Sequence, residues 1–220
     1  MCIRDRALSA FELMPRIGLD FVLAHIAGTR DPLSARHAWY VLVELTASSA
    51  GDRLKSLLIR LLEKGMAEGF LIDATVAETI EQKDAFWRLR DSLPEAQKHE
   101  GASIKHDISV PVSKIPEFME RATALVHERL LGARICAFGH VGDGNLHFNL
   151  SQPEGADEGD FLKEWEGVNA WIHGLAIQLD GSFSAEHGVG QMKRAELQRV
   201  GAELSHVVDE GQKRRERARG

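Results

Sequence analysis

Cysteine is scarce in this sequence of 220 residues, since only Cys2 and Cys136 occur. Two cysteines exclude a disulfide framework of the kind that holds small secreted domains together, and they fit a reducing, cytoplasmic setting. The sequence also lacks any apolar run near the roughly 20 residues that a membrane-spanning helix needs. Nor do its first residues show the apolar stretch and small-residue cleavage site of a secretory signal peptide. We therefore expect a cytoplasmic protein without a transmembrane segment.

Positive charge is in the minority. Lys and Arg number 27 against 33 Asp and Glu, which gives a formal net charge of −6 and a pI near 5.9. This balance argues against a nucleic-acid partner, because such proteins are usually basic. The densely charged residues 212–220 are expected to form a solvated tail. A length of 220 residues suffices for one large domain or two small ones with a buried core.

Short apolar runs alternate with amphipathic segments along the chain. The runs predict strands at 40–46, 70–77, 106–112, 134–140 and 145–150. Apolar residues at helical spacing predict helices at 54–65, 81–99, 115–131 and 161–180. Within the second helix, Pro94 is expected to start a new turn or to cause a kink. This order predicts an α+β fold, a largely antiparallel sheet with packed helices in a ferredoxin-like or duplicated ferredoxin-like arrangement, plus a C-terminal helical part.

A glycine-rich stretch, GHVGDGNLH at 139–147, links the last two predicted strands. Gly142 and Gly144 permit the backbone angles of a tight turn, and such a turn can bring His140 and His147 together. Two histidines and a carboxylate form a common site for zinc, manganese or iron. Taken alone, the pattern fits equally well a glycine-rich hairpin whose histidines are incidental.

A second glycine-rich stretch is GSFSAEHGVGQMKR at 181–194. Glu186 can complete a metal site, while His187 points to a different side and can face a substrate. Gly188 allows a ligand or cofactor to approach the backbone closely. The alternative is a Glu-His pair with ordinary surface roles in the first turn of a helix. The stretch lacks the Gly-x-x-x-x-Gly-Lys-Ser/Thr pattern of a phosphate loop.

These two stretches, together with LSAFELM at 8–14 and SIKHDISVP at 103–111, resemble the C-terminal domain of FAD-linked oxidases of the vanillyl-alcohol-oxidase type. The resemblance is strongest to the members that oxidise D-2-hydroxyglutarate, D-lactate or glycolate. It extends over residues 7–197. Residues 1–6 are interpreted as an artefactual leader, and residues 198–220 as a charged tail.

The resemblance implies the substrate-binding cap domain of a flavoprotein that oxidises a D-2-hydroxy acid to the 2-oxo acid. It implies that a divalent metal, typically zinc, is bound by His140, His147 and Glu186, with His187 as the catalytic base. The substrate is implied to contact Arg90, Lys105 and Asn149, and the FAD to lie near Asn145 and Gly188. Where some relatives place a hydroxyl residue against a distal carboxylate, this chain has Pro94. The resemblance therefore leaves D-2-hydroxyglutarate and D-lactate both open.

The chemistry of these residue types agrees with such a reaction. A metal lowers the pKa of a bound hydroxyl group, a histidine can take its proton near neutral pH, and cationic side chains fix carboxylates. The hydride needs an acceptor that no side chain provides, namely a flavin or a nicotinamide.

In the family the flavin-binding part precedes the segment that begins at residue 7. We therefore expect a fragment that does not hold FAD and is inactive by itself. The sequence leaves open whether an electron-transfer flavoprotein or a quinone accepts the electrons. Two alternatives to the oxidoreductase remain: a metal-dependent hydrolase with His187 as the base for water, and a non-catalytic module that binds a metal or a ligand.

Overall fold

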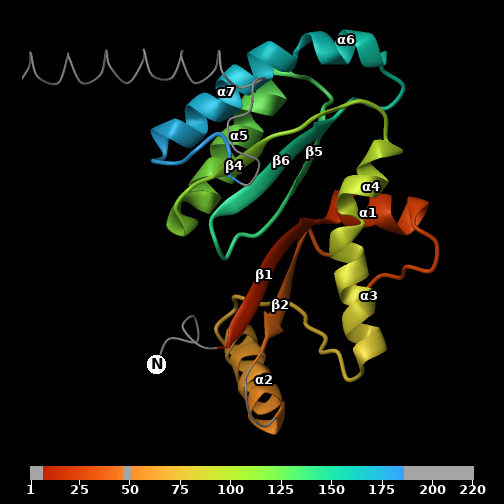
Figure 1. The fold of residues 1–220 in the computed structure, drawn as a ribbon, viewed down its shortest axis with the longest axis vertical. Helices are drawn as coiled ribbons and strands as arrows, with labels where there is room; N and C mark the ends of the chain where they lie inside the picture. Colours follow the sequence, from red (N-terminus) through yellow and green to blue (C-terminus); the bar gives the residue numbers. More distant parts are fainter. Residues whose placement is uncertain (1–6, 47–50, 186–220) are drawn as a thin grey trace, which may run out of the picture.

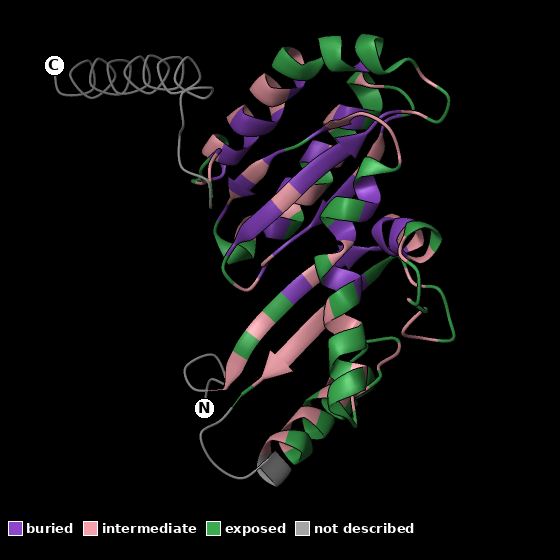
Figure 2. Cartoon of the chain, turned by 45° about the vertical axis from the view of Figure 1, so that its right-hand side comes forward, coloured by how far each residue is buried: buried purple, intermediate pink, exposed green. Residues whose placement is uncertain are grey.

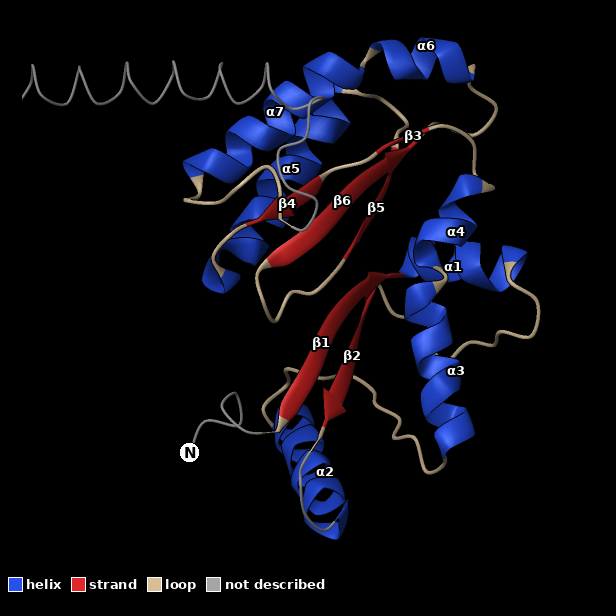
Figure 3. Ribbon diagram, viewed as in Figure 1, coloured by secondary structure: helices blue, strands red, loops and turns tan. Residues whose placement is uncertain are grey.

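The computed structural model describes residues 7–46 and 51–185 and has the predicted α+β architecture. The strands are β1 (Leu8–Pro15), β2 (Trp39–Leu45), β3 (Ser103–Ile104), β4 (Asp107–Ser109), β5 (Arg134–Phe138) and β6 (Asn145–Ser151). The helices are α1 (Arg16–His25), α2 (Gly51–Ala67), α3 (Ile80–Asp91), α4 (Leu93–Lys98), α5 (Ile115–Arg129), α6 (Glu158–Lys163) and α7 (Trp165–Gln178), with a 3-10 turn η2 (Val112–Lys114). None of the helices in these ranges is long and apolar enough to cross a membrane. A sheet covered by helices lies above a long antiparallel pair of strands, β1 and β2, which is called the hairpin below although α1 connects its strands (Figure 1, Figure 3).

β6 is the central strand of the larger sheet and is antiparallel to all its neighbours. β5 lies along one side of it, and β3 and β4 lie along the other. β4 and β5 are therefore parallel to each other and are connected through α5, which is the split β-α-β unit of a ferredoxin-like sheet. On the outer side of β4, Ser109 forms an antiparallel bridge with Ser182, where the fourth strand of such a sheet lies. The ferredoxin-like arrangement is thus confirmed for this part of the chain. The first part is not a second copy of it, because β1 and β2 pair directly and antiparallel.

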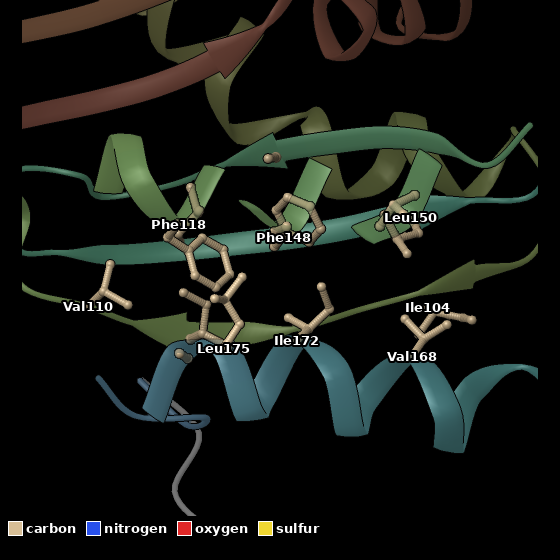
Figure 4. Packing of buried hydrophobic residues seen from close by; sticks show 14 of the residues in the cluster. Ile104, Val110, Phe118, Phe148, Leu150, Val168, Ile172 and Leu175 are labelled. Atoms are coloured by element: carbon tan, nitrogen blue, oxygen red, sulfur yellow. The ribbon is translucent and has the colours of Figure 1, made fainter. Parts of the chain in front are cut away.

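One face of this sheet is apolar and is covered by α5 and α7 (Figure 4). Phe148 and Leu150 point from β6 into this layer and are fully buried. They meet Phe118 of α5, and Ile172 and Leu175 of α7. The removal of this apolar surface from water is the main favourable contribution to folding. The layer therefore holds the sheet and its two helices together as one unit.

The opposite face of the sheet carries the polar residues that matter for the site. His147 and Asn149 alternate with the apolar residues of β6, and opposite them on β5 lie Phe138 and Cys136. Helices α1 and α4 cover the β5 side of this face. A Cβ atom on Gly18 would lie 2.7 Å from Cδ2 of Leu93, so glycine lets α1 pack closely on α4 without a shift of the Leu93 side chain. Buried residues gather in the sheet and its helices, whereas α2 and the far end of the hairpin are intermediate or exposed (Figure 2).

The β1–β2 hairpin joins the sheet at the end of β5. Leu13 forms a bridge with Gly139, in which the two backbone N–H groups donate to the carbonyl oxygens at 2.9 and 3.2 Å. The sequence did not predict β1 or α1. Apolar residues occupy both faces of β1, with Phe11 and Leu13 on one and Met14 on the other, so the alternation that identifies a half-buried strand is missing.

Four other predicted elements differ from the structure. The strand predicted at 70–77 is wrong, because these residues form a loop in which Phe70 and Ile72 are 80% and 85% exposed. The predicted helix 81–99 is divided into α3 and α4, since Pro94 fits the first turn of a new helix but not a helix interior. The helix predicted at 161–180 likewise breaks at Glu164. Of the strand predicted at 106–112, only the three residues of β4 pair.

Candidate functional site

The glycine-rich turn between β5 and β6 brings the two histidines together, as the sequence predicted. The carbonyl oxygen of His140 accepts hydrogen bonds from the backbone N–H groups of Asp143 at 2.9 Å and Asn145 at 3.1 Å. Gly144 has a φ of +81°, and a Cβ there would lie 2.2 Å from the carbonyl oxygen of Val110, so only glycine fits. The rings of His140 and His147 end 6.3 Å apart, centroid to centroid. Two imidazoles that share one ion through bonds of about 2 Å have centroids about 5–6 Å apart. The observed separation is slightly larger than this range.

A buried carboxylate, Glu12 of β1, connects the turn to helix α3. Its Oε1 lies 2.7 Å from Nδ1 of His140, and its Oε2 accepts a hydrogen bond from Nε of Arg90 at 2.8 Å. A carboxylate can only accept hydrogen bonds, so Nδ1 of His140 is the donor to Glu12, and Nε2 is the nitrogen that a metal would take. Metal-binding histidines usually donate their other N–H to a carboxylate or a carbonyl in this way. The geometry at His140 therefore fits a metal ligand.

Arg90 lies in the last turn of α3 and belongs to the same cluster. Its guanidinium carbon is 5.2 Å from the centre of the Phe138 ring, and that ring is 5.2 Å from the ring of His147. The arginine is buried. Three residues that the sequence analysis singled out, Arg90, His140 and His147, thus converge on one end of the sheet.

Lys105 and Asn149 lie farther along the polar face of the sheet. Lys105 is exposed between β3 and β4. Burial raises the pKa of the Cys136 thiol on β5 to about 12, and the charge of Lys105 opposes this rise. Asn149 is buried, accepts from the backbone N–H of His106 at 3.3 Å and donates to Gln97 Oε1 at 3.0 Å. The amide of Asn149 therefore ties β6 to α4, and its contact with a substrate stays a prediction.

The second glycine-rich stretch enters the site along β4. Ser182 and Ser109 exchange backbone hydrogen bonds of 2.8 and 2.9 Å, and the N–H of Ala185 donates to the carbonyl of Asp107 at 3.2 Å. Asp107 in turn lies opposite His147 in the sheet. Glu186, His187 and Gly188 lie outside the described residues. Within residues 7–46 and 51–185, no three His, Cys, Asp or Glu side chains are grouped as a metal site.

A cavity of about 250 Å³ lies beside the histidine turn. It is lined by residues 8–12 of β1, His140, Gly142 and Asp143. Pockets for drug-sized ligands are about 300–1,000 Å³, so this one suits a small acid. A larger cavity of about 870 Å³ is formed by the loop at 28–34, residues 75–78 and α3. None of its lining residues is a histidine, so we place the chemistry at the smaller cavity.

Sequence reasoning missed Glu12 and Asp107 as site residues. Both lie in stretches that carried the family resemblance, but neither was given a role. A usable signal existed for Glu12, because it is the only charged residue in β1, LSAFELMP. A single acid in an otherwise largely apolar strand indicates a buried partner of opposite charge or a hydrogen-bond donor. Asn145, predicted to lie near the cofactor, is buried at the start of β6.

The family described as FAD linked oxidases, C-terminal domain, matches residues 2–205 of this chain. The chain is 35% identical over 193 residues to the mitochondrial D-2-hydroxyglutarate dehydrogenase of Arabidopsis thaliana, covering 86% of this chain and 32% of that protein. It is 34% identical over 205 residues to the D-2-hydroxyglutarate dehydrogenase of Stutzerimonas stutzeri, covering 91% of this chain and 43% of that protein. It is also 34% identical over 187 residues to the mitochondrial enzyme of the same name from Danio rerio, covering 85% and 33%.

These matches bear out the resemblance drawn from the sequence. The chain spans less than half the length of the curated relatives that it matches, 32% in one case and 43% in another. The matched family covers the hairpin, the histidine turn and the helices that frame the site. The chain therefore belongs to the family of FAD linked oxidases, C-terminal domain.

Proposed function

We propose that this chain is the substrate-binding and metal-binding part of an FAD-dependent dehydrogenase that oxidises a D-2-hydroxy acid to the 2-oxo acid. The substrate is D-2-hydroxyglutarate or D-lactate. The observation that carries the proposal is the cluster of Arg90, Glu12 and His140. Glu12 and His140 of this cluster line a cavity of the size of a small acid. Family membership and the names of the relatives support an oxidoreductase.

The metal ligands in this proposal are His140, His147 and Glu186, and the metal is a divalent ion such as zinc. Two observations support it. The Nδ1–H of His140 points at Glu12, which leaves Nε2 as the ligating nitrogen, and the chain reaches Ala185 alongside the strand that pairs with His147. When bound, the metal would supply positive charge that lowers the pKa of the substrate hydroxyl group, and FAD would supply the acceptor for the hydride of C2.

The protein side chains then bind the acid and remove one proton. Arg90 binds the substrate carboxylate through charge-assisted hydrogen bonds. Lys105, exposed on the same face of the sheet, holds the second carboxylate when the acid is D-2-hydroxyglutarate. Asn149 is proposed to support the substrate from β6. His187 takes the proton of the hydroxyl oxygen, so that the C–O bond becomes C=O as the C2–H bond breaks. Asn145 and Gly188 are the residues proposed to lie near the FAD.

Two other functions make different predictions. A metal-dependent hydrolase would use His187 to activate water, and a non-catalytic module would only bind. The relatives are named dehydrogenases, which favours the redox reaction. The electron acceptor, an electron-transfer flavoprotein or a quinone, is left open. The plant and fish relatives are named as mitochondrial, so the cytoplasmic location stays a prediction.

The test uses the full-length flavoprotein that carries this chain, loaded with Zn²⁺ and kept free of oxygen. Addition of D-2-hydroxyglutarate or D-lactate should bleach the flavin absorbance, and the L enantiomers should not. The amount of 2-oxo acid formed should equal the amount of flavin reduced. Absence of bleaching with every D-2-hydroxy acid would rule the proposal out, and release of a hydrolysis product instead would favour the hydrolase.

A further inference from the structure

We infer that Glu12 is a positioning residue that fixes two members of the site at once: the arginine that binds the substrate and a histidine that binds the metal. The inference rests on the proposed function, which gives Arg90 and His140 these roles. It gives a role to a third residue, Glu12 of β1, which the proposed function names only as a neighbour of Arg90 and His140.

The register of β1 places Glu12 between its two partners. The bridge between Leu13 and Gly139 brings β1 against the end of β5, next to His140. The Glu12 side of β1 faces α3, whose last turn carries Arg90. Each carboxylate oxygen has its own partner, Oε1 with His140 Nδ1 at 2.7 Å and Oε2 with Arg90 Nε at 2.8 Å. Loss of the charge on Glu12 therefore affects both partners.

The bond to Nε determines which edge of the arginine is presented. With Nε on Glu12 and the guanidinium over the Phe138 ring, rotation about the last side-chain bonds is restricted. Among the described residues, the Arg90 side chain makes one hydrogen bond, from Nε to Glu12. The edge formed by Nη1 and Nη2 can then take a carboxylate in the two-point manner that arginine favours.

The fold itself does not require an acid at this position. Glu12 lies opposite Leu42 in the hairpin and is followed on the same face by Met14, so its surroundings on the strands are apolar. Its side chain is 3% exposed. A buried carboxylate is unfavourable unless it is paired, and an apolar side chain of similar size often stabilises such a position as well or better. The presence of a carboxylate at position 12 is therefore explained by its hydrogen bonds to His140 and Arg90.

The experiment replaces Glu12 in the full-length flavoprotein by glutamine, which keeps the shape and removes the charge. We expect the Kd for Zn²⁺, measured by equilibrium dialysis of chelator-treated protein, to rise about 10–100-fold, as for other groups that orient a metal-binding histidine. We expect the KM for the D-2-hydroxy acid to rise about tenfold, by more than kcat falls, because Arg90 loses its orientation.

Glu44 provides a matched control on the same face of the same hairpin. Its carboxylate also holds α3, through Trp87 Nε1 at 3.1 Å and Lys83 Nζ at 2.8 Å. Neither Trp87 nor Lys83 belongs to the site. Glu44→Gln should leave the Kd for Zn²⁺ and the KM within about twofold of the wild type, as is usual for a partly exposed pair.

Wild-type affinity for Zn²⁺ and substrate in Glu12→Gln overturns the inference. Equal losses in Glu12→Gln and Glu44→Gln do so too, because then the anchoring of α3 alone matters. If Glu12→Gln does not fold, Glu12→Asp, which keeps the charge, is measured instead. Failure of both to fold while Glu44→Gln folds makes Glu12 a purely structural residue and overturns the inference as well. A wild-type protein that neither binds Zn²⁺ nor oxidises a D-2-hydroxy acid contradicts the proposed function first, and the role of Glu12 with it.

Discussion

The backbone N–H of Ala185 donates a hydrogen bond to the carbonyl oxygen of Asp107 at 3.2 Å. Asp107 lies directly opposite His147 in the sheet. Ala185 therefore lies beside β4, the strand that pairs with a proposed metal ligand. This relationship agrees with the proposal that Glu186 is the third metal ligand. The proposed roles of Glu186 as a ligand and His187 as a base can be separated by mutation.

We predict that His140→Ala and His187→Ala have different effects in the full-length flavoprotein. His140→Ala should lose both the metal and the activity, because it removes a ligand. His187→Ala should keep nearly all its Zn²⁺ and slow flavin reduction by about 10²–10⁴, the usual effect of removing an acid–base group. Metal content by mass spectrometry and stopped-flow flavin absorbance give the two readouts. If His187→Ala strips the metal as thoroughly as His140→Ala, the assigned roles are wrong.

We predict that Arg90→Lys weakens substrate binding and leaves the metal in place. Lysine keeps the charge but cannot offer two parallel N–H groups together with a third to Glu12. The KM for the D-2-hydroxy acid should rise about 10–100-fold, the equivalent of one charge-assisted hydrogen bond of about 1.5–3 kcal/mol. Arg88→Lys is the control, because Arg88 is exposed and its side chain donates to the carbonyl of Ala27, outside the site. An equal rise in KM in the two variants would contradict the proposed role of Arg90 in substrate binding.

The sequence predicted the histidine pair from local information. His140 and His147 belong to one turn, so the spacing of two glycines and two histidines is enough to place the imidazoles close together. Glu12 is different, because it lies 128 residues before His140 and 78 before Arg90. Such contacts depend on how β1 docks against β5 and α3. Spacing along the chain carries no information about that docking.

The fold shows the same division between local and tertiary information. α5 was predicted nearly to the residue because Phe118, Ala122 and Val126 recur on one face. The loop at 70–77 was predicted as a strand from composition alone, but a strand forms only where another strand offers its backbone groups. The direct pairing of β1 with β2 likewise follows from tertiary packing.

We predict that Phe118→Ala strongly destabilises the full chain. The ring of Phe118 is fully buried between α5 and β6 and meets the Phe148 ring edge-on, with centroids 5.6 Å apart. Its removal should lower the free energy of unfolding by about 3–5 kcal/mol, through lost burial and the cavity left behind. Urea denaturation followed by circular dichroism measures the loss. Leu131→Ala, at a position that is 90% exposed, should change stability little, and a similar loss in both variants would contradict the assigned core.

We predict that Glu100 makes the stability of the chain depend on pH in the acid range. The Glu100 carboxylate lies 2.6 Å from His25 Nε2 and also pairs with Arg134. Burial raises the pKa of this carboxyl group. The hydrogen bonds and charges of His25 and Arg134 together lower the pKa by more than burial raises it, so it lies below the ordinary 4.5. A carboxyl group with a lowered pKa stabilises the folded state above its unfolded pKa. That contribution is lost as the pH falls through the folded pKa.

Glu100→Gln should therefore lower the free energy of unfolding at pH 7 by about 1–2 kcal/mol, the scale of a charge-assisted hydrogen bond that is partly screened. The difference from the wild type should shrink as the pH falls below 4.5, the ordinary value of this group, because the wild type then loses the same charge. Urea titrations at a series of pH values measure the difference. Glu154→Gln is the control, since Glu154 is 87% exposed and lies 3.8 Å from the same arginine. Equal losses in the two variants, or a difference that widens toward acid pH, would show that the Glu100 carboxylate is not the group responsible.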